Sequence, residues 1–251
     1  MPLSNVSVTC LYLAVAAYAL SFVSFMLGKE RVTAKFFIVG FVFHTVSQLS
    51  RGWFIGVFTP IAIFEGVFSL PWCLAFLTLY IGFFEKNKRS IYSAVIPVLF
   101  FCLISLLYLK GVFPPSPQLQ TVFSSLFFVF EVLAHACFYL AAWFSIRYLY
   151  DGRDPGFLNP LVVWGFILYS IAQVVGAVWC YLGWASLFNW SERHLQSASI
   201  WCFYAVFIHL RFLGGWDTKK KAWFAIAGFA LVFLFSYIGH LGEMNSPRLG
   251  G

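Results

Sequence analysis

Long apolar runs recur along the chain, separated by short polar connectors. A helix needs roughly 20 apolar residues to cross the hydrocarbon core of a bilayer. Runs of that order predict eight transmembrane helices, at about 6–27, 36–55, 61–84, 91–113, 121–148, 159–182, 197–213 and 222–241. The first run is followed directly by charge and has no small-residue cleavage site, so we expect a retained helix and not a signal peptide.

The connectors are short, as in 29–35, 85–89 and 216–221, and no Gly/Ser-rich linker or charged tail marks a second domain. No convincing internal repeat is visible. The pattern therefore predicts an all-α polytopic membrane helix bundle of about eight transmembrane helices, with 1–251 as a single transmembrane domain.

Basic residues are distributed unequally between alternate connectors. Twelve Lys and Arg fall on one side and four on the other. The positive-inside rule places the first group in the cytoplasm, so both termini are expected outside. A cell inner membrane is the expected location, and a thylakoid equivalent stays open.

Composition agrees with a bilayer environment. The chain is 61% hydrophobic and 10% charged, against about 25% charged residues in ordinary globular domains. The net charge of +7 comes from short clusters and not from a basic stripe with spaced aromatics, so we expect the lipid bilayer as partner and no nucleic acid. The six cysteines lie singly in apolar runs with no CxxC or CxxCH, which excludes covalent c-type haem attachment to this chain.

One outer connector, at about 179–196, is unusually aromatic. It holds Trp184, Phe188 and Trp190 together with the cation of Arg193. Such a cluster fits an interfacial aromatic belt. It equally fits a platform on which a flat apolar ligand stacks, with Arg193 near the anionic groups of that ligand.

Five histidines sort into two depths when the rise of 1.5 Å per residue is applied. His44 and His209 fall toward the inner surface, His135 and His240 toward the outer one, and His194 lies in the aromatic loop. Two facing helices that each carry a neutral imidazole can supply both axial ligands of haem iron. Zinc is disfavoured because no third ligand is close in sequence. The alternative is that each histidine only bonds a neighbouring helix.

The aromatic connector and the helix after it resemble a known segment. The matching positions, without a gap in spacing, are Gly176, Trp179, Trp184, Trp190, Trp201, His209 and Arg211. They resemble the tryptophan-rich "WWD" segment of the CcsA/CcmC/ResC-type haem-handling proteins of cytochrome c assembly. The stretch from Pro60 through Glu65 to Trp72 and the position of His135 are also similar to that family.

The chain departs from the family pattern at several positions. Phe188 stands for a Trp, Ser191 for an Asp, Glu192 for a Pro, Arg193 for a Lys and His194 for a Glu. The family's G-L-H-S-Y motif is missing from 243–251. His240 lies several residues before the place of that motif's histidine.

The resemblance implies an eight-helix core that presents non-covalent, b-type haem at the outer face to apocytochrome c, often with a CcsB/ResB-type membrane partner. It implies stacking of the porphyrin on Trp184, Phe188 and Trp190, and a propionate at Arg193. It also implies iron ligation outside by the pair His135 and His240 and inside by the pair His209 and His44. A component of a holocytochrome c synthase is one such role. Two alternatives remain: a diverged paralogue that is a structural or regulatory subunit of a membrane complex, and a bis-His b-type electron carrier.

Overall fold

The computed structural model describes most of the chain. The described residues are 3–56, 58, 63–84, 88–108, 117–152, 156–188, 190–210 and 212–238. Within them all regular structure is helical: α1 (Leu3–Met26), α2 (Glu30–Ile55), α3 (Ile63–Phe84), α4 (Lys88–Tyr92), α5 (Val95–Leu107), the 3₁₀ turn η1 (Pro117–Gln120), α6 (Val122–Asp151), α7 (Leu158–Trp184), α8 (Glu192–Leu210) and α9 (Thr218–Ser236). The predicted all-α polytopic bundle is confirmed.

Seven of the eight expected spans each correspond to one helix, and the span at 91–113 corresponds to α4 and α5. Six described segments are long and apolar enough to cross a membrane: Asn5–Met26, Glu30–Phe54, Gly66–Phe84, Ser90–Leu107, Val122–Asp151 and Leu158–Trp184. The helices α8 and α9 are 19 residues each. Polar residues fill their first turns, from Glu192 to His194 in α8 and from Lys219 to Lys221 in α9, which shortens their apolar portions.

The span expected at 91–113 is interrupted near its start. A turn at Ser93 and Ala94 separates α4 from α5, and α5 ends at Leu107. Pro97 explains the break, because a proline has no N–H to donate and its ring clashes with the carbonyl four residues earlier, here that of Ser93. That carbonyl instead accepts from the Ile96 N–H at 3.1 Å. Pro97 thus lies in the first turn of α5, where proline is tolerated.

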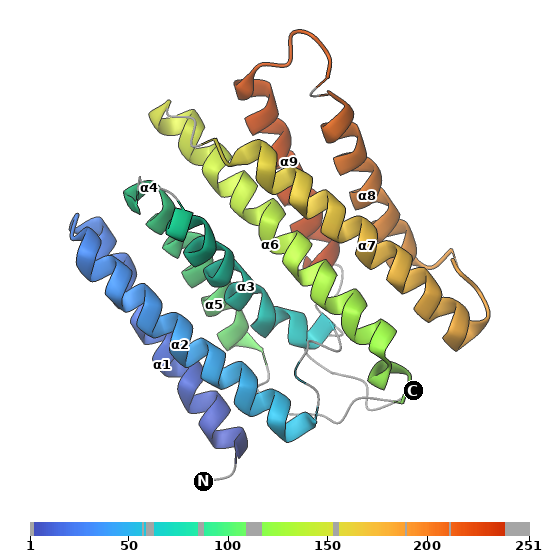
Figure 1. The fold of residues 1–251 in the computed structure, drawn as a ribbon, viewed down its shortest axis with the longest axis horizontal. Coiled ribbons are helices and arrows are strands. Elements are labelled where there is room, and N and C mark those ends of the chain that lie inside the picture. The colour runs from blue at the N-terminus through green and yellow to red at the C-terminus, as the bar shows by residue number, and fades with distance from the viewer. Residues whose placement is uncertain are drawn as a thin grey trace. The chain divides into compact units, whose positions relative to one another are not determined.

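The chain divides into two compact units. In unit 1, which contains α1 to α5, the hairpin of α1 and α2 packs beside the hairpin of α3 and α5. Contacts between α2 and α3 and between α1 and α5 close the four long helices into a ring (Figure 1). Its interior holds fully buried side chains such as Tyr18, Phe37, Leu74 and Phe101.

Unit 2 contains α6 to α9 and repeats this ring arrangement. The antiparallel pair of α6 and α7 packs against α9 and α8 respectively, and α8 contacts α9 (Figure 1). Two helices begin at a capping side chain: Thr121 accepts from the Ser124 N–H at 3.2 Å before α6, and Asp217 accepts from the Lys220 N–H at 2.9 Å before α9. Buried aromatic rings, including Phe138, form the centre of the unit.

Neighbouring helices approach closely where a glycine faces an aromatic ring. A Cβ on the glycine would lie 2.5 to 2.8 Å from the ring or hydroxyl in four pairs: Gly40 with Tyr18, Gly165 with Phe138, Gly176 with Phe127, and Gly228 with Tyr204. Small residues at helix crossings are the usual means of packing helices in a membrane, where apolar surface alone gives no preference for protein over lipid.

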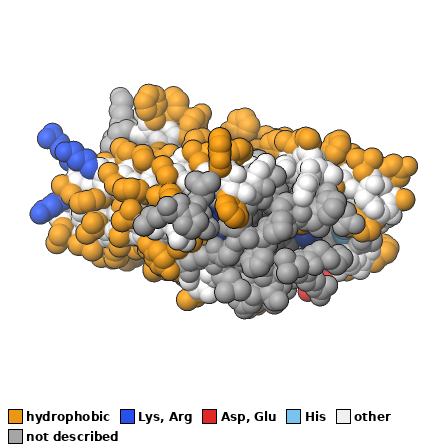
Figure 2. Space-filling model, turned by 90° about the horizontal axis from the view of Figure 1, so that it is seen from below, with side chains coloured by type: hydrophobic (Ala, Val, Ile, Leu, Met, Phe, Trp, Pro, Cys, Tyr) orange, Lys and Arg blue, Asp and Glu red, His pale blue; other side chains and the backbone are white. Residues whose placement is uncertain are grey.

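The outer surface of the helices is apolar. Large side chains such as Leu20, Val42, Phe83 and Val174 are exposed, and hydrophobic side chains dominate the described surface in Figure 2. This is the surface of a multi-pass membrane protein, in which lipid covers the residues that water would not tolerate.

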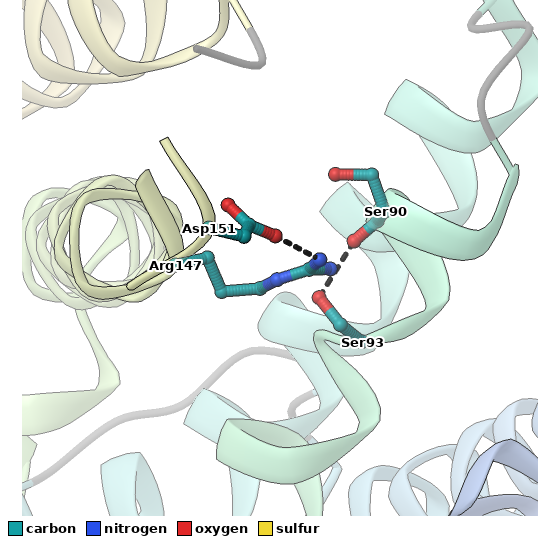
Figure 3. Close-up of polar contacts among 4 residues, drawn as sticks. All are labelled: Ser90, Ser93, Arg147 and Asp151. Atoms are coloured by element: carbon teal, nitrogen blue, oxygen red, sulfur yellow. Dashed lines mark hydrogen bonds and ion pairs between the residues drawn. The ribbon is translucent and has the colours of Figure 1, made fainter. Parts of the chain in front are cut away.

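Polar contacts gather at helix ends. In unit 2, Arg147 donates to Asp151 at 2.8 Å in the last turn of α6. In unit 1, the Ser93 hydroxyl donates to the Ser90 carbonyl at 2.6 Å in the turn between α4 and α5. Both contacts are drawn in Figure 3. The exposed Arg147–Asp151 ion pair contributes little stability, about 0.3–0.5 kcal/mol for an i,i+4 pair.

Candidate functional site

The connector between α7 and α8 begins with an abrupt turn. Ala185 has a φ of 55°, and its N–H bonds the Tyr181 carbonyl at 2.8 Å. It is the only described residue other than glycine with a positive φ. A left-handed conformation costs a side-chain-bearing residue roughly 1–2 kcal/mol. The left-handed conformation of Ala185 ends α7 at Trp184 and directs the chain into the aromatic connector.

A groove of about 700 Å³ runs between α7 and α8 inside unit 2. That volume falls within the roughly 300–1,000 Å³ of small-molecule and cofactor sites. Most of its lining is apolar. The lining residues that bear on its chemistry are Phe127, Gln173, Trp179, Cys180, Trp184, Phe188, Ser191, Arg193, His194 and Trp201.

Aromatic rings form one wall of the groove. Trp179 is buried, and its ring lies edge-on to Trp184 at 5.6 Å between centroids. Phe188 contacts Trp190 edge-on at the same distance. Trp184 and Phe188 line the groove, whereas Trp190 is 83% exposed and does not line it. The predicted stacking residues are thus neighbours, with Trp190 at the outside of the cluster.

Arg193 extends over the other end of this aromatic wall. Its guanidinium carbon lies 5.9 Å and 5.6 Å from the ring centroids of Phe127 and Phe128, close enough for cation–π attraction. Its Nη2 is buried without a hydrogen-bond partner, as is Nε2 of Gln173. Glu131 on α6 interacts with Arg193 electrostatically. Unused donors beside an apolar groove favour a ligand that carries carboxylates.

Two hydrogen bonds tie α7 to α8 below the aromatic wall. The Trp201 indole N–H donates to the Ser170 hydroxyl at 3.0 Å, and the Tyr169 hydroxyl donates to the Ser197 carbonyl at 3.3 Å. These bonds hold the two walls of the groove at a fixed separation.

His194 lies in the first turn of α8 and lines the groove. Its Nδ1 is 2.9 Å from the Ser191 hydroxyl, and its Nε2 is 3.5 Å from the Cys180 sulfur. The ring packs edge-on against Phe188 at 5.2 Å. Burial, with a smaller contribution from the positive charge of Arg193, lowers the pKa of His194 below its usual 6.5.

The sequence analysis did not include His194 or Cys180 among the site residues. For Cys180 the signal that could have revealed it is helical spacing, since it lies one turn before Trp184 on α7. For His194 the signal is its place in the aromatic connector, four residues after Trp190. Their contact depends on how α7 and α8 approach each other, which spacing alone does not give.

His135 lies deeper in unit 2. It is buried in α6, with its ring 5.7 Å from that of Tyr169 and 6.4 Å from that of Tyr139. Its Nε2 has no hydrogen-bond partner, yet His135 is not among the residues that line the groove. Its predicted role as an iron ligand stays a prediction.

The two histidines of the predicted inner pair lie in different units. In unit 1, His44 is fully buried, and its Nε2 donates to the Phe68 carbonyl at 3.2 Å, one turn before Pro71 in α3. Gln48 donates to the same carbonyl at 2.8 Å. In unit 2, His209 is exposed near the end of α8, and its Nδ1 donates to the Ala205 carbonyl at 2.7 Å.

The remaining predicted ligand, His240, lies outside the described residues. Among the residues that the structure describes, no group of three or more His, Cys, Asp or Glu could hold a metal ion.

Comparison with known proteins gives consistent matches. A family model described as "Cytochrome C assembly protein" matches residues 61–243. "Cytochrome c biogenesis protein CcsA" of Prochlorococcus marinus (strain NATL1A) is 39% identical over 75 residues, which cover 30% of this chain and 24% of that protein. CcsA of Cyanophora paradoxa is 33% identical over 79 residues, covering 32% and 24%. The chain thus matches about a quarter of the length of these relatives.

A solved structure shares the fold. The chain superposes on "Cytochrome c Heme Lyase CcmF" with a TM-score of 0.74 over 97% of this chain and 49% of that one, at 14% sequence identity. The arrangement of helices is therefore one already seen in a larger protein.

Proposed function

This chain belongs to the cytochrome c assembly protein family, and from that membership we propose that it binds haem non-covalently in the groove between α7 and α8 and presents it at the outer face of the membrane to apocytochrome c. The observation that carries the proposal is the groove itself. It combines an aromatic wall with two unused hydrogen-bond donors, on Arg193 and Gln173.

The lining residues fit haem chemically. Trp184 and Phe188 offer ring faces and edges to a flat porphyrin, and Trp190 supports Phe188. The Arg193 guanidinium and the Gln173 amide suit the two propionates, since charge-assisted hydrogen bonds are the stronger kind. The N-terminal turn of α8 adds a favourable dipole for an anion.

When bound, haem supplies the vinyl groups that form thioether bonds with the two cysteines of a CxxCH segment. The part of this chain is to hold and orient the haem and to exclude water from its faces. The described lining of the groove contains no carboxylate, so charge on its walls would attract the propionates and not repel them.

Several finer expectations belong to the same proposal. The outer iron ligands His135 and His240, the inner pair His44 and His209, a CcsB/ResB-type membrane partner, and a cell inner membrane or thylakoid location follow from the resemblance. The matched segment covers only 24% of the CcsA protein of Prochlorococcus marinus (strain NATL1A). The activity of that whole protein is therefore attributed to this chain only within this proposal.

The test is haem binding by the full chain, purified in detergent. We expect a b-type spectrum whose haem is removed by acidified organic solvent. A stacked aromatic ring contributes about 0.5–1.5 kcal/mol beyond its buried area, so Trp184→Ala should weaken haem affinity about tenfold or less, given that 1.4 kcal/mol is a factor of ten. Trp184→Ala combined with Trp190→Ala should weaken it more.

Trp164→Ala is the matched control, because Trp164 is exposed on α7 and does not line the groove. Its haem content should equal that of the unchanged chain. Retention of full haem affinity by the double Trp variant would refute the groove as the haem site, and a chain that binds no haem would favour a structural or regulatory subunit.

A further inference from the structure

Three polar side chains meet at the groove, from the end of α7, the connector and the start of α8. The His194 ring lies between the Cys180 sulfur, 3.5 Å from Nε2, and the Ser191 hydroxyl, 2.9 Å from Nδ1. All three residues line the groove. Two of its members, Ser191 and His194, stand where the family pattern named in the sequence analysis has Asp and Glu.

Both contacts are compatible with a ring whose lone pair is on Nε2. A cysteine of ordinary pKa is a thiol at neutral pH, and a thiol is a weak donor to a ring nitrogen. In this tautomer the Cys180 S–H donates to Nε2, and the Nδ1–H donates to the Ser191 hydroxyl.

A histidine prepared in this way has the features of a metal ligand. Ligating imidazoles almost always donate their other N–H to a polar neighbour, which fixes the tautomer and the ring orientation. Ser191 fills that position for His194. The contact of Nε2 with a thiol is weak, so little is lost when a metal replaces it.

We infer that His194, oriented by Ser191, ligates the iron of a haem bound in the groove, in place of the outer pair His135 and His240 that the resemblance implies. The inference rests on the proposed haem-binding function and adds to it the residue that meets the iron. Among the described histidines, His194 is the one that lines the groove, whereas His135 lies in the interior beside Tyr169. Ser191 is a positioning residue, and Cys180 is the group displaced from Nε2.

The experiment compares absorption and electron paramagnetic resonance spectra of the purified full chain, loaded with haem, with those of single variants. His194→Ala should change the ligation signature and weaken haem affinity at least tenfold, and added imidazole should restore the signature by filling the vacant position. Ser191→Ala should weaken affinity about tenfold or more without changing the ligand type, since loss of an orienting partner typically costs 10–100-fold in metal affinity.

Matched controls separate these effects from loss of folding. Ser199→Ala removes an exposed hydroxyl of α8 that bonds only its own helix, at Leu195, and Cys10→Ala removes a thiol in unit 1. Both should keep the spectrum of the unchanged chain. Cys180→Ala should keep histidine ligation, because the thiol is displaced in the haem-bound form.

The outcomes distinguish this inference from the proposed function. If the chain binds haem in a manner sensitive to Trp184→Ala, but His194→Ala leaves the spectrum unchanged, then His194 is not the ligand and the groove still is the site. If only His135→Ala removes the ligation signature, the iron ligand is His135 and not His194. A thiolate signature lost in Cys180→Ala also overturns the inference. If the unchanged chain binds no haem, both proposals fall together.

Discussion

The packing of unit 2 depends on the Phe138 ring. It stacks on Tyr204, with centroids 3.5 Å apart and planes 6° apart. It also lies against Gly165 of α7, where an added Cβ would lie 2.6 Å and 2.7 Å from two ring atoms. We therefore expect Gly165→Ala to destabilise unit 2, and with it the groove between α7 and α8.

The magnitude follows from these distances. Carbon atoms prefer a separation of about 3.5–4.0 Å, so Phe138 or α7 would need to move by about 0.8 Å or more. The ring has little room to move, because the fully buried Tyr204 stacks on it. Overpacking of this kind costs about 1–3 kcal/mol, while alanine gains up to about 1 kcal/mol over glycine in a helix.

The assay is thermal unfolding in detergent, with Gly183→Ala as the matched control. Gly183 is on the same helix, and a Cβ there would meet nothing within 4 Å. Since both changes replace a helical glycine by alanine, the difference between them reports mostly the packing cost, about 2 kcal/mol. For a chain of this size that corresponds to a Tm lower by roughly 4–8 °C than in Gly183→Ala.

A second substitution tests the cause. Shrinking the ring with Phe138→Leu in the Gly165→Ala background should cost less than the sum of the two single changes, since residues in contact are not additive. Equal Tm values for Gly165→Ala and Gly183→Ala would refute the close packing of α6 on α7. Strict additivity in the double variant would show that the cost arises elsewhere.

Three further outcomes are expected. Arg193→Gln should weaken haem affinity roughly tenfold or more in haemin titration, because hydrogen bonds to charged groups contribute about 1.5–3 kcal/mol. Arg193→Lys keeps the charge and should weaken the affinity less. Equal loss of affinity in both variants would show that the charge of Arg193 does not contribute to haem binding. Iron ligation by His194 requires a neutral ring whose pKa lies below 6.5, so the ligation signature should persist through pH 6.5 and disappear only at lower pH; loss already above pH 7 would contradict this. Reporter fusions after Lys88 and Lys220 should be active only as cytoplasmic fusions, and outward activity at either place would overturn the predicted orientation.

The helices could be predicted from the sequence because length and apolar composition decide them locally. Runs such as 159–182 need no knowledge of their neighbours to form a helix in a bilayer. The interruption of the span at 91–113 was also within reach, since Pro97 is visible in the sequence and its effect on a preceding helix is local. The prediction of one continuous span did not apply this local rule for proline, and the break does not depend on the tertiary fold.

The site was harder to predict because it depends on contacts between helices. The aromatic connector and Arg193 were predicted from the aromatic content of the connector and from the family resemblance, and the structure places Trp184, Phe188 and Arg193 on one groove. Depth along a helix placed His135 toward the outer side but gave no information about which face it occupies. The structure puts it beside Tyr169, two turns of α6 from Phe127, which does line the groove.

The departures from the family pattern change the charge around Arg193. Ser191 and His194 stand where the pattern has Asp and Glu, whereas Glu192 stands for a Pro, so the segment carries one carboxylate fewer. Glu192 does not line the groove, and an acidic group that acts on Arg193 is Glu131 of α6. The buried Nη2 of Arg193 still has no hydrogen-bond partner, and a buried polar group is costly without one. A propionate would supply that partner beside the His194 ring, so the substitutions are compatible with the proposed haem site.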